Sequence, residues 1–219
     1  METTKNTQTA ETIADPSALG LLGLAMVTLV ASSQKLGLTE GVSLVIPWAI
    51  FLGGFVQLIA CIIDAKKNNV FGATAFGGYA FFWFSVAMTW FIQNGVFGEK
   101  LQAGADSHQL GFAFVGYLIF TLFMTIGSME TNKVLFIIFT LINFLFIGLA
   151  LSSFGIAYEA AHKLAGWSEF LISLVSFYGC GANVLNRHFG REFLPLGKPF
   201  GIFKGENAQV RGVKTLLER

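Results

Sequence analysis

The sequence has little charge and few of the residues that build catalytic or metal-binding sites. Charged residues make up 12% of its 219 residues, well below the roughly 25% of soluble domains. Its two cysteines have no paired spacing, and its three histidines lie in separate polar segments without ligand spacing. No GxSxG motif, P-loop or glycine-rich dinucleotide fingerprint occurs. We therefore expect no catalysis, no metal and no cofactor.

Long apolar stretches fill most of the sequence instead. Each has about 20 residues, the length that a helix rising roughly 1.5 Å per residue needs to cross about 30 Å of hydrocarbon. The stretches cover 16–36, 42–63, 70–92, 110–127, 134–154 and 167–185. Because backbone groups in lipid must bond internally, the sequence predicts an all-α integral membrane protein with six transmembrane helices. A membrane domain at 16–185 would lie between a polar tail at 1–15 and a basic tail at 186–219.

The distribution of basic residues predicts the orientation of the chain. With the N-terminus inside, 11 of the 14 lysines and arginines fall on the cytoplasmic side. The other side has only Lys35, Lys100 and Lys163. Lysine and arginine near helix ends tend to stay cytoplasmic, so we expect both termini in the cytoplasm. The net charge of +1 gives no support to a nucleic-acid partner.

Small and weakly polar residues recur at helical spacing within the stretches. In the last one, Ser173, Ser176, Cys180 and Asn183 follow steps of three or four. Helix packing alone could explain any one such stripe, because small residues allow close approach and hydroxyls bond across helices. Similar stripes begin at Gly20, Gly53 and Tyr117 in three other stretches, and four stripes together favour the lining of a channel. The candidate polar lining residues are Thr28, Gln57, Thr121, Asn143, Ser176 and Asn183.

None of the apolar stretches carries a charged residue in its middle. Lys35, Asp64 and Glu169 lie near the ends of stretches, where we expect charged groups to reach water. Intramembrane charges usually mark proton relays, voltage sensors and ion-coupling sites. Their absence favours passage of a neutral solute or a small weak acid.

The start of the first stretch carries a recognisable segment. Pro16 suits the first turn of a helix and Asp15 suits the cap before it. Asp15, Pro16, Leu19, Gly20 and Leu21 resemble the Asn-Pro-Ala-Pro-Leu-Gly-Leu signature of the acetate uptake transporter family, of the bacterial succinate-acetate permease type. Further segments that resemble this family are 71–76, 120–124, 184–191 and 194–197. The similarity covers about 15–199, nearly the whole membrane domain.

The resemblance implies a six-helix protomer in a homohexamer, in the cytoplasmic membrane of a bacterium or archaeon. Each protomer would carry its own path for acetate and related carboxylates, succinate among them. The family's path is constricted midway by a Phe, a Tyr and a Leu, which fall here at Leu24, Tyr79 and Ile142. Only Tyr79 is identical, so a waist of different width or shape is expected.

Two other interpretations stay open at this point. A channel for a neutral solute such as urea or ammonia could use the same uncharged lining. A structural or receptor-like membrane protein would share the hydropathy but would not need polar stripes on several helices. The sequence also leaves open whether a carboxylate passes as an anion or together with a proton.

Overall fold

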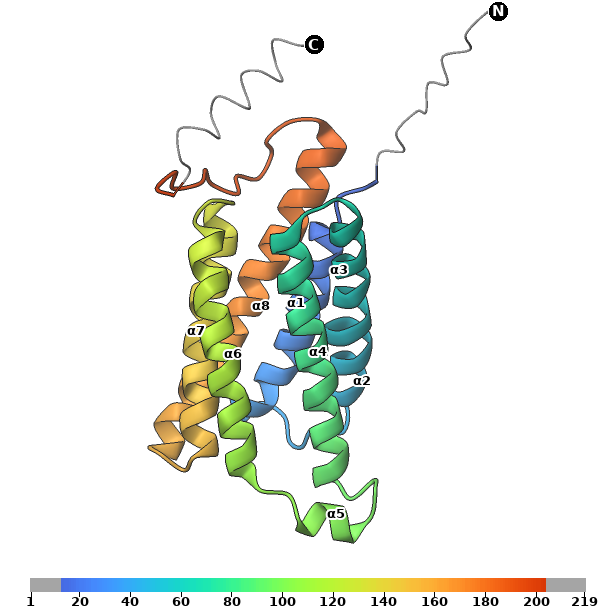
Figure 1. Ribbon diagram of the computed structural model, residues 1–219, viewed down its shortest axis with the longest axis vertical. Coiled ribbons are helices and arrows are strands. Elements are labelled where there is room, and N and C mark those ends of the chain that lie inside the picture. The colour runs from blue at the N-terminus through green and yellow to red at the C-terminus, as the bar shows by residue number, and fades with distance from the viewer. Residues whose placement is uncertain (1–12, 204–219) are drawn as a thin grey trace, which may run out of the picture.

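The computed structural model describes residues 13–203, and all regular structure in that range is helical (Figure 1). Six helices are long and apolar enough to cross a membrane. They are α1 (Ser17–Lys35), the continuous run of α2 (Ile46–Trp48), η1 (Ala49–Val56) and α3 (Gln57–Lys66), α4 (Val70–Gln93), α6 (Ser107–Ser128), α7 (Lys133–Ser153) and α8 (Tyr158–Phe189). A short helix, α5 (Glu99–Ala103), joins α4 to α6. The predicted all-α fold with six spans is confirmed.

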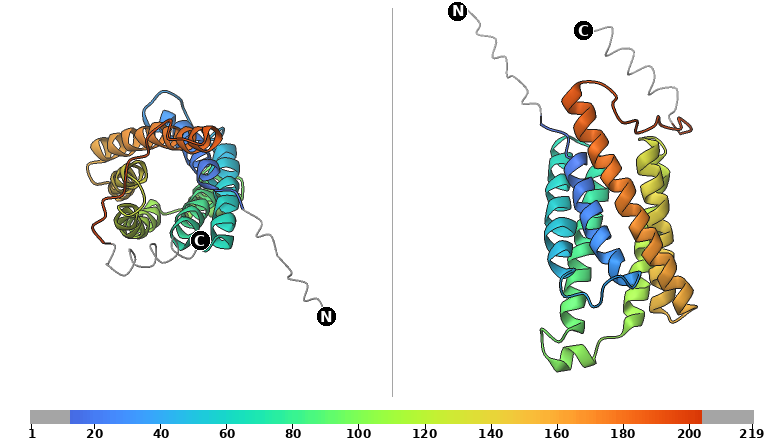
Figure 2. Two further views of the ribbon diagram at one scale, coloured as in Figure 1. Left: turned by 90° about the horizontal axis from the view of Figure 1, so that it is seen from above. Right: turned by 180° about the vertical axis from the view of Figure 1, so that it is seen from behind.

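The spans form a ring when viewed along their axes (Figure 2). α8 packs against α1 and α7, α7 packs against α6, and the second span packs between α1 and α4. α4 and α6 close the ring along a narrow seam, where the Tyr117 hydroxyl donates to the Gly78 carbonyl at 3.0 Å. The described chain begins and ends at the upper end in Figure 1, and α5 lies at the lower end.

The outer surface of the ring is apolar rather than charged. Phe51, Phe112 and Phe123 are 60%, 72% and 66% exposed, and many other large apolar side chains face outward beside them. A water-facing surface with so much exposed aromatic area would favour aggregation, whereas hydrocarbon accommodates it. The molecule is therefore a multi-pass membrane protein.

The second span contains a π-helical segment, η1, over Ala49–Val56. π-Helical turns are rare and often occur near functional sites. A Cβ added at Gly53 would meet the Trp83 side chain, and one at Gly54 would meet Phe84. The two glycines thus let α4 approach closely and bring Trp83 into the interior of the ring, where it is 3% exposed.

The last helix is longer than the predicted stretch at 167–185. α8 has 32 residues, which at 1.5 Å each gives about 48 Å of helix. Glu159 and Lys163 are exposed at its lower end, so the helix continues beyond the apolar stretch into the polar region. The predicted tails are described only in part, because residues 1–12 and 204–219 lie outside the described range.

A segment after α8, residues 191–203, folds over the upper end; we refer to it as the strap. Gly190 ends the helix in the left-handed conformation with φ 64°, which glycine adopts without steric cost. Asn186 holds the start of the strap through hydrogen bonds with the backbone of Phe193 and Leu194. Val134 then donates its backbone N–H to the Leu196 carbonyl at 3.1 Å.

Candidate functional site

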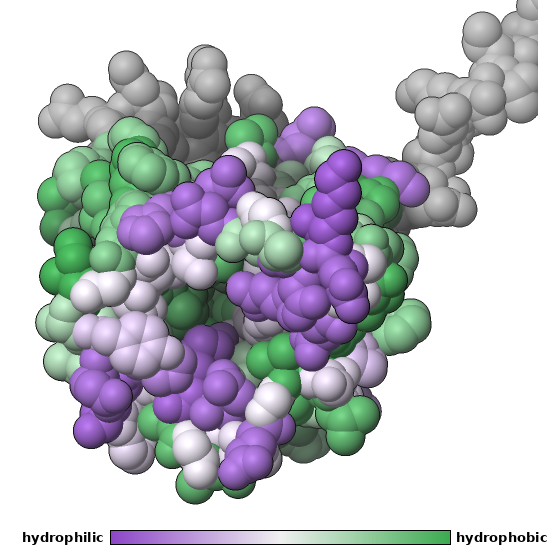
Figure 3. Space-filling model, turned by 90° about the horizontal axis from the view of Figure 1, so that it is seen from below, coloured by the Kyte–Doolittle hydropathy of each residue, from purple (hydrophilic) through white to green (hydrophobic). Residues whose placement is uncertain are grey.

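Three spaces lie along the inside of the ring. The upper vestibule, a cavity of about 220 Å³, is lined by residues of α1, α3, α4, α7 and α8. The lower vestibule, of about 320 Å³, is lined by residues of α1, α4, α6, α7 and α8. Figure 3 views the lower end, where hydrophilic residues surround a hollow. Between the vestibules is a space of about 10 Å³, the waist, which is at the lower limit for one water molecule.

The waist connects the two vestibules through residues that they share with it. Leu24, Tyr79 and Ile142 line both the waist and the upper vestibule. Phe82 and Trp83 line both the waist and the lower vestibule. The three spaces therefore form one interrupted path, and side chains rather than backbone close it.

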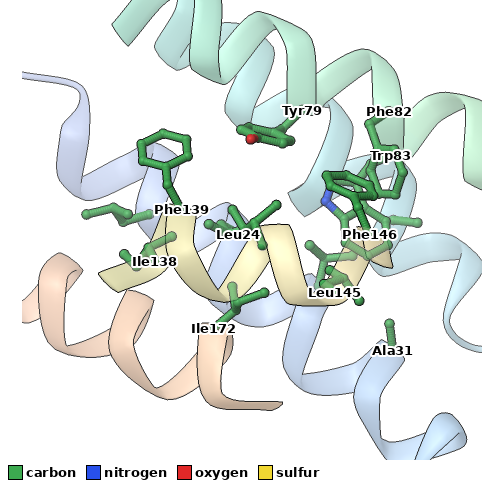
Figure 4. Close-up of a cluster of buried hydrophobic side chains, with 14 of the residues drawn as sticks. Leu24, Ala31, Tyr79, Phe82, Trp83, Ile138, Phe139, Leu145, Phe146 and Ile172 are labelled. Carbon is green, nitrogen blue, oxygen red and sulfur yellow. The ribbon is translucent and has the colours of Figure 1, made fainter. Parts of the chain in front are cut away.

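The structure brings together the three residues expected at a constriction. Leu24, Tyr79 and Ile142 come from α1, α4 and α7, and are 7%, 4% and 3% exposed. Figure 4 shows Leu24 and Tyr79 among the buried apolar side chains around them. The Tyr79 hydroxyl lies 2.9 Å from the Thr121 hydroxyl of α6. Because this bond anchors the phenol, Tyr79 offers a fixed ring to the path rather than a freely rotating hydroxyl.

A second layer of the waist was not predicted. It contains Phe82, Trp83, Leu145, Phe146 and Ile172. Phe146 is 1% exposed and packs edge-on against Phe82, with ring centroids 5.2 Å apart. Residues three and four positions apart share a helix face, so the positions one turn after Tyr79 and Ile142 would have identified most of this layer.

Only some of the predicted polar residues line the path. Thr28 lines the waist and donates its hydroxyl to the Leu24 carbonyl at 2.7 Å. Gln57 and Asn183 line the upper vestibule. The Gln57 amide donates to the Gly53 carbonyl at 3.0 Å and the Asn183 amide to the Gly179 carbonyl at 2.7 Å, which leaves each amide a second N–H and its carbonyl oxygen.

Thr121, Asn143 and Ser176 line none of the three spaces. Asn143 donates to the Thr125 hydroxyl at 2.7 Å and so joins α7 to α6. Thr121 joins α6 to α4 through Tyr79. The packing explanation of polar stripes fits these two residues. Ser176 is 0% exposed, and its hydroxyl has no hydrogen-bond partner.

The expectation that the charged groups near span ends reach water is wrong for Asp64 and Glu169, whereas Lys35 is half-buried in the wall of the lower vestibule. Asp64 and Glu169 are 1% and 2% exposed, and the Lys35 side chain is 11% exposed. Lys35 Nζ lies 2.9 Å from Glu169 Oε2 and joins α1 to α8. Glu169 seemed terminal because the predicted stretch began at Trp167, but α8 begins at Tyr158. The ion pair offsets part of the large cost of burying each charge.

Asp64 lies in the wall of the upper vestibule. Its Oδ1 accepts a hydrogen bond from Asn69 Nδ2 at 3.0 Å, and Asn69 in turn caps α4 by accepting from the Gly72 N–H. Asp64 Oδ2 is buried without a partner. A buried carboxylate oxygen without a protein donor is costly, and this oxygen belongs to a side chain in the cavity wall.

The signature segment forms the start of α1, but Pro16 rather than Asp15 occupies the N-cap position, because the helix begins one residue later than expected, at Ser17. Asp15 Oδ1 accepts from the Ser17 N–H at 2.8 Å, and its Oδ2 lies 3.7 Å from Lys67 Nζ. Burial alone would raise the pKa of Asp15, but the hydrogen bonds from Ser17 and the charge of Lys67 outweigh it and lower the pKa. Pro16 and Gly20 are buried, Leu19 is exposed, and Leu21 lines the upper vestibule.

Comparisons with known proteins agree with this geometry. The model of the GPR1/FUN34/yaaH family matches residues 1–193. The succinate-acetate/proton symporter SatP of Escherichia coli K12 is 32% identical over 187 residues, covering 85% of this chain and 96% of its own. Ammonia transport outward protein 2 of Saccharomyces cerevisiae is 28% identical over 178 residues, covering 80% and 62%. The solved structure of the bacterial acetate channel SatP matches with a TM-score of 0.78 and 30% identity, covering 84% of this chain and 99% of that one.

Proposed function

The chain belongs to the GPR1/FUN34/yaaH family, and from this premise we propose that it is a channel or transporter for acetate and related small carboxylates, succinate among them. The observation that carries the proposal is the interrupted path of two vestibules and a waist inside one protomer. The Escherichia coli relative is named as a symporter and the solved structure as a channel, and we propose that this chain likewise carries solute rather than performing catalysis, with no cofactor.

The chemistry of the path suits a small weak acid. A carboxylate needs hydrogen-bond donors or charge, which the vestibule walls offer, while a methyl group tolerates the apolar waist. Acetic acid has a pKa near that of a glutamate side chain, about 4.3. A proton carried on the acid itself would therefore remove most of the cost of crossing the apolar layer.

We propose that Leu24, Tyr79 and Ile142 set the minimum width of the path. All three line the waist, and a space of about 10 Å³ cannot hold acetate. Passage requires the aliphatic side chains to change rotamer, because Tyr79 is anchored to Thr121. The shape of this layer would then discriminate acetate from longer acids.

The proposal extends to orientation and assembly. Lys66, Lys67 and Lys133 lie at the upper end, beside the described parts of both tails, and their charge supports a cytoplasmic upper end. The seam between α4 and α6 exposes an apolar groove on the outside of the ring, lined by Gly78 and Phe120 among others. We propose that protomers assemble as a homohexamer in a bacterial or archaeal cytoplasmic membrane, as the family resemblance implies.

Flux measurements on the purified protein in liposomes test the proposed function. Radiolabelled acetate should enter protein-containing vesicles faster than empty ones, and unlabelled acetate should compete better than urea. A parallel assay of ammonia entry, followed by an internal pH dye, tests the activity named for the yeast relative. Ammonia flux without acetate flux through folded protein would overturn the proposal in favour of the neutral-solute alternative.

A further inference from the structure

A buried ion pair stands in the wall of the lower vestibule, within the path itself. Lys35 and Glu169 both line this cavity, and their charged groups are 2.9 Å apart. Among the described residues, Lys35 is the one lysine or arginine that lines either vestibule or the waist. It is therefore the single fixed positive charge that a carboxylate meets along the described path.

Helix packing does not require this pair. The α1–α8 contact is already close, since a Cβ added at Gly166 would lie 3.1 Å from the side chains of Lys35 and Leu36, and Ala165 and Ile172 beside it are fully buried. A buried ion pair contributes little net stability, and an apolar pair of similar volume often serves as well. The two charges in the cavity wall therefore point to a functional reason rather than a structural one.

The position of the pair relates it to the waist. Trp83 and Phe82 line the lower vestibule together with Lys35 and also line the waist. A carboxylate moving from the lower vestibule toward the waist leaves water and enters the aromatic layer. Lys35 lines the same cavity as these aromatic residues, so its cation offsets part of the loss of hydration on the way into the aromatic layer.

We infer that Lys35 is a carboxylate-binding site for the transported acid, at which the substrate carboxylate exchanges with the carboxylate of Glu169. The inference rests on the proposed function and adds a named site to it. Lys35 attracts and holds the anion, whereas Glu169 competes for the same ammonium group and releases the anion. Transport needs binding strong enough for entry and weak enough for exit, and the competing carboxylate supplies the second condition.

Single neutral substitutions at the two positions should have opposite effects on substrate affinity. Lys35→Gln removes the cation and should raise the acetate concentration for half-maximal flux about tenfold, the effect of losing one charge-assisted hydrogen bond. Glu169→Gln removes the competitor and should lower that concentration about threefold while reducing maximal flux, because release slows. A pair that only joins α1 to α8 would give changes of the same direction in both variants.

Matched controls come from exposed charges at the same end of α8. Lys163→Gln and Glu159→Gln each remove one charge that lies outside the lower vestibule, so both should retain the wild-type half-saturating concentration. All variants are compared at pH 7 on equal amounts of protein that elutes as a single species in detergent.

The double variant Lys35→Gln/Glu169→Gln covers the case in which Lys35→Gln leaves Glu169 unpaired and prevents folding. Its two amides can hydrogen-bond without buried charge, so it should fold and show the raised half-saturating concentration. A half-saturating acetate concentration that is unchanged in the double variant, or that shifts in the same direction in both single variants, would overturn the site. The proposed function would still stand in that case, provided that the wild-type protein carries acetate. No acetate flux through folded wild-type protein would overturn both.

Discussion

The upper and lower vestibules hold buried charge in different ways. In the upper one, Asp64 has one oxygen bonded to Asn69 and one without a partner, and no described lysine or arginine lines the cavity. In the lower one, Glu169 is neutralised by Lys35. An anion at the lower mouth would meet the Lys35 ammonium, for which Glu169 competes, whereas an anion at the upper mouth would meet the Asp64 carboxyl and no described lysine or arginine. The comparison indicates that the two ends of one path have unequal roles in binding and release.

The largest expected effect concerns which end of the protein faces the cytoplasm, because a single cysteine is either labelled or left unlabelled. A single cysteine at Lys198→Cys, on the exposed strap, should stay unlabelled by an impermeant thiol reagent in intact cells, because the upper end is proposed to be cytoplasmic. One at Gly104→Cys, at the exposed lower end, should react. Both are made in a background without Cys61 and Cys180, and lysed cells give the full-labelling reference. The reverse pattern would assign the cation to the cytoplasmic mouth.

Enlarging the waist should weaken the separation between the vestibules. Ile142→Ala and Tyr79→Ala remove side chains that line it, so the succinate-to-acetate flux ratio should rise about tenfold. Leu24→Phe should lower the ratio by narrowing the path. A buried large-to-Ala change costs about 2–5 kcal/mol of stability, so ratios are taken on protein of equal folded amount.

A matched control keeps the waist result specific. Leu122→Ala truncates a side chain on α6 that is 50% exposed, and the ratio should remain that of the wild type. A ratio that is unchanged in all three waist variants would show that Leu24, Tyr79 and Ile142 only pack helices.

Removing the charge of Asp64 should make the upper vestibule less unfavourable for an anion, and in that respect more like the lower vestibule. Asp64→Asn retains an oxygen that can accept from Asn69 but removes the negative charge, so acetate should bind more easily from the upper side. We expect the half-saturating concentration to fall about threefold, a modest fraction of a charged interaction. Asp106→Asn at the exposed lower end is the control. A rise in Asp64→Asn would assign the carboxyl a direct part in transport.

The smallest expected effect concerns Asp15 at the upper rim. Asp15→Ala removes the acceptor for the Ser17 N–H at the start of α1 and should cost about 0.5–1 kcal/mol, comparable to the loss of an exposed N-cap side chain. Since the pKa of Asp15 is lowered in the folded state, its contribution is present above the unfolded pKa of about 3.9 and is lost as pH falls through the folded value. Thermal unfolding at pH 7 and pH 3 should show the difference between variant and wild type shrinking in acid. A difference that stays constant between the two pH values would contradict a stabilising role for the ionised Asp15 carboxylate.

The hydropathy of the sequence was sufficient for the fold, because length and apolar content alone define a membrane span. The same signal misjudged α8, since a helix continues through polar residues such as Glu159 when its backbone bonds are satisfied. That error concealed the burial of Glu169. Its partner Lys35 lies 134 positions away, and no local pattern links two residues so far apart in sequence.

The part of the candidate site that could be predicted from the sequence was the part that the family resemblance located. Leu24, Tyr79 and Ile142 came from matching motifs, and the structure puts them around one space. The polar stripes were less informative. Thr28 lines the waist and Thr121 bonds between helices, although both are hydroxyls at helical spacing. Which of the two environments a residue has depends on how the helices are rotated, and a stripe pattern leaves that rotation undetermined.

The narrow waist has an electrical consequence. Vestibules that fill with water conduct ions, so the membrane voltage falls mainly across the thin apolar layer between them. Moving one elementary charge through 100 mV involves about 2.3 kcal/mol, and an acetate anion would meet nearly all of it within the layer around Tyr79 and Phe146. An undissociated acid would meet none. The slope of flux against voltage in planar bilayers therefore measures which species crosses, with a value near one charge for the anion and zero for the acid.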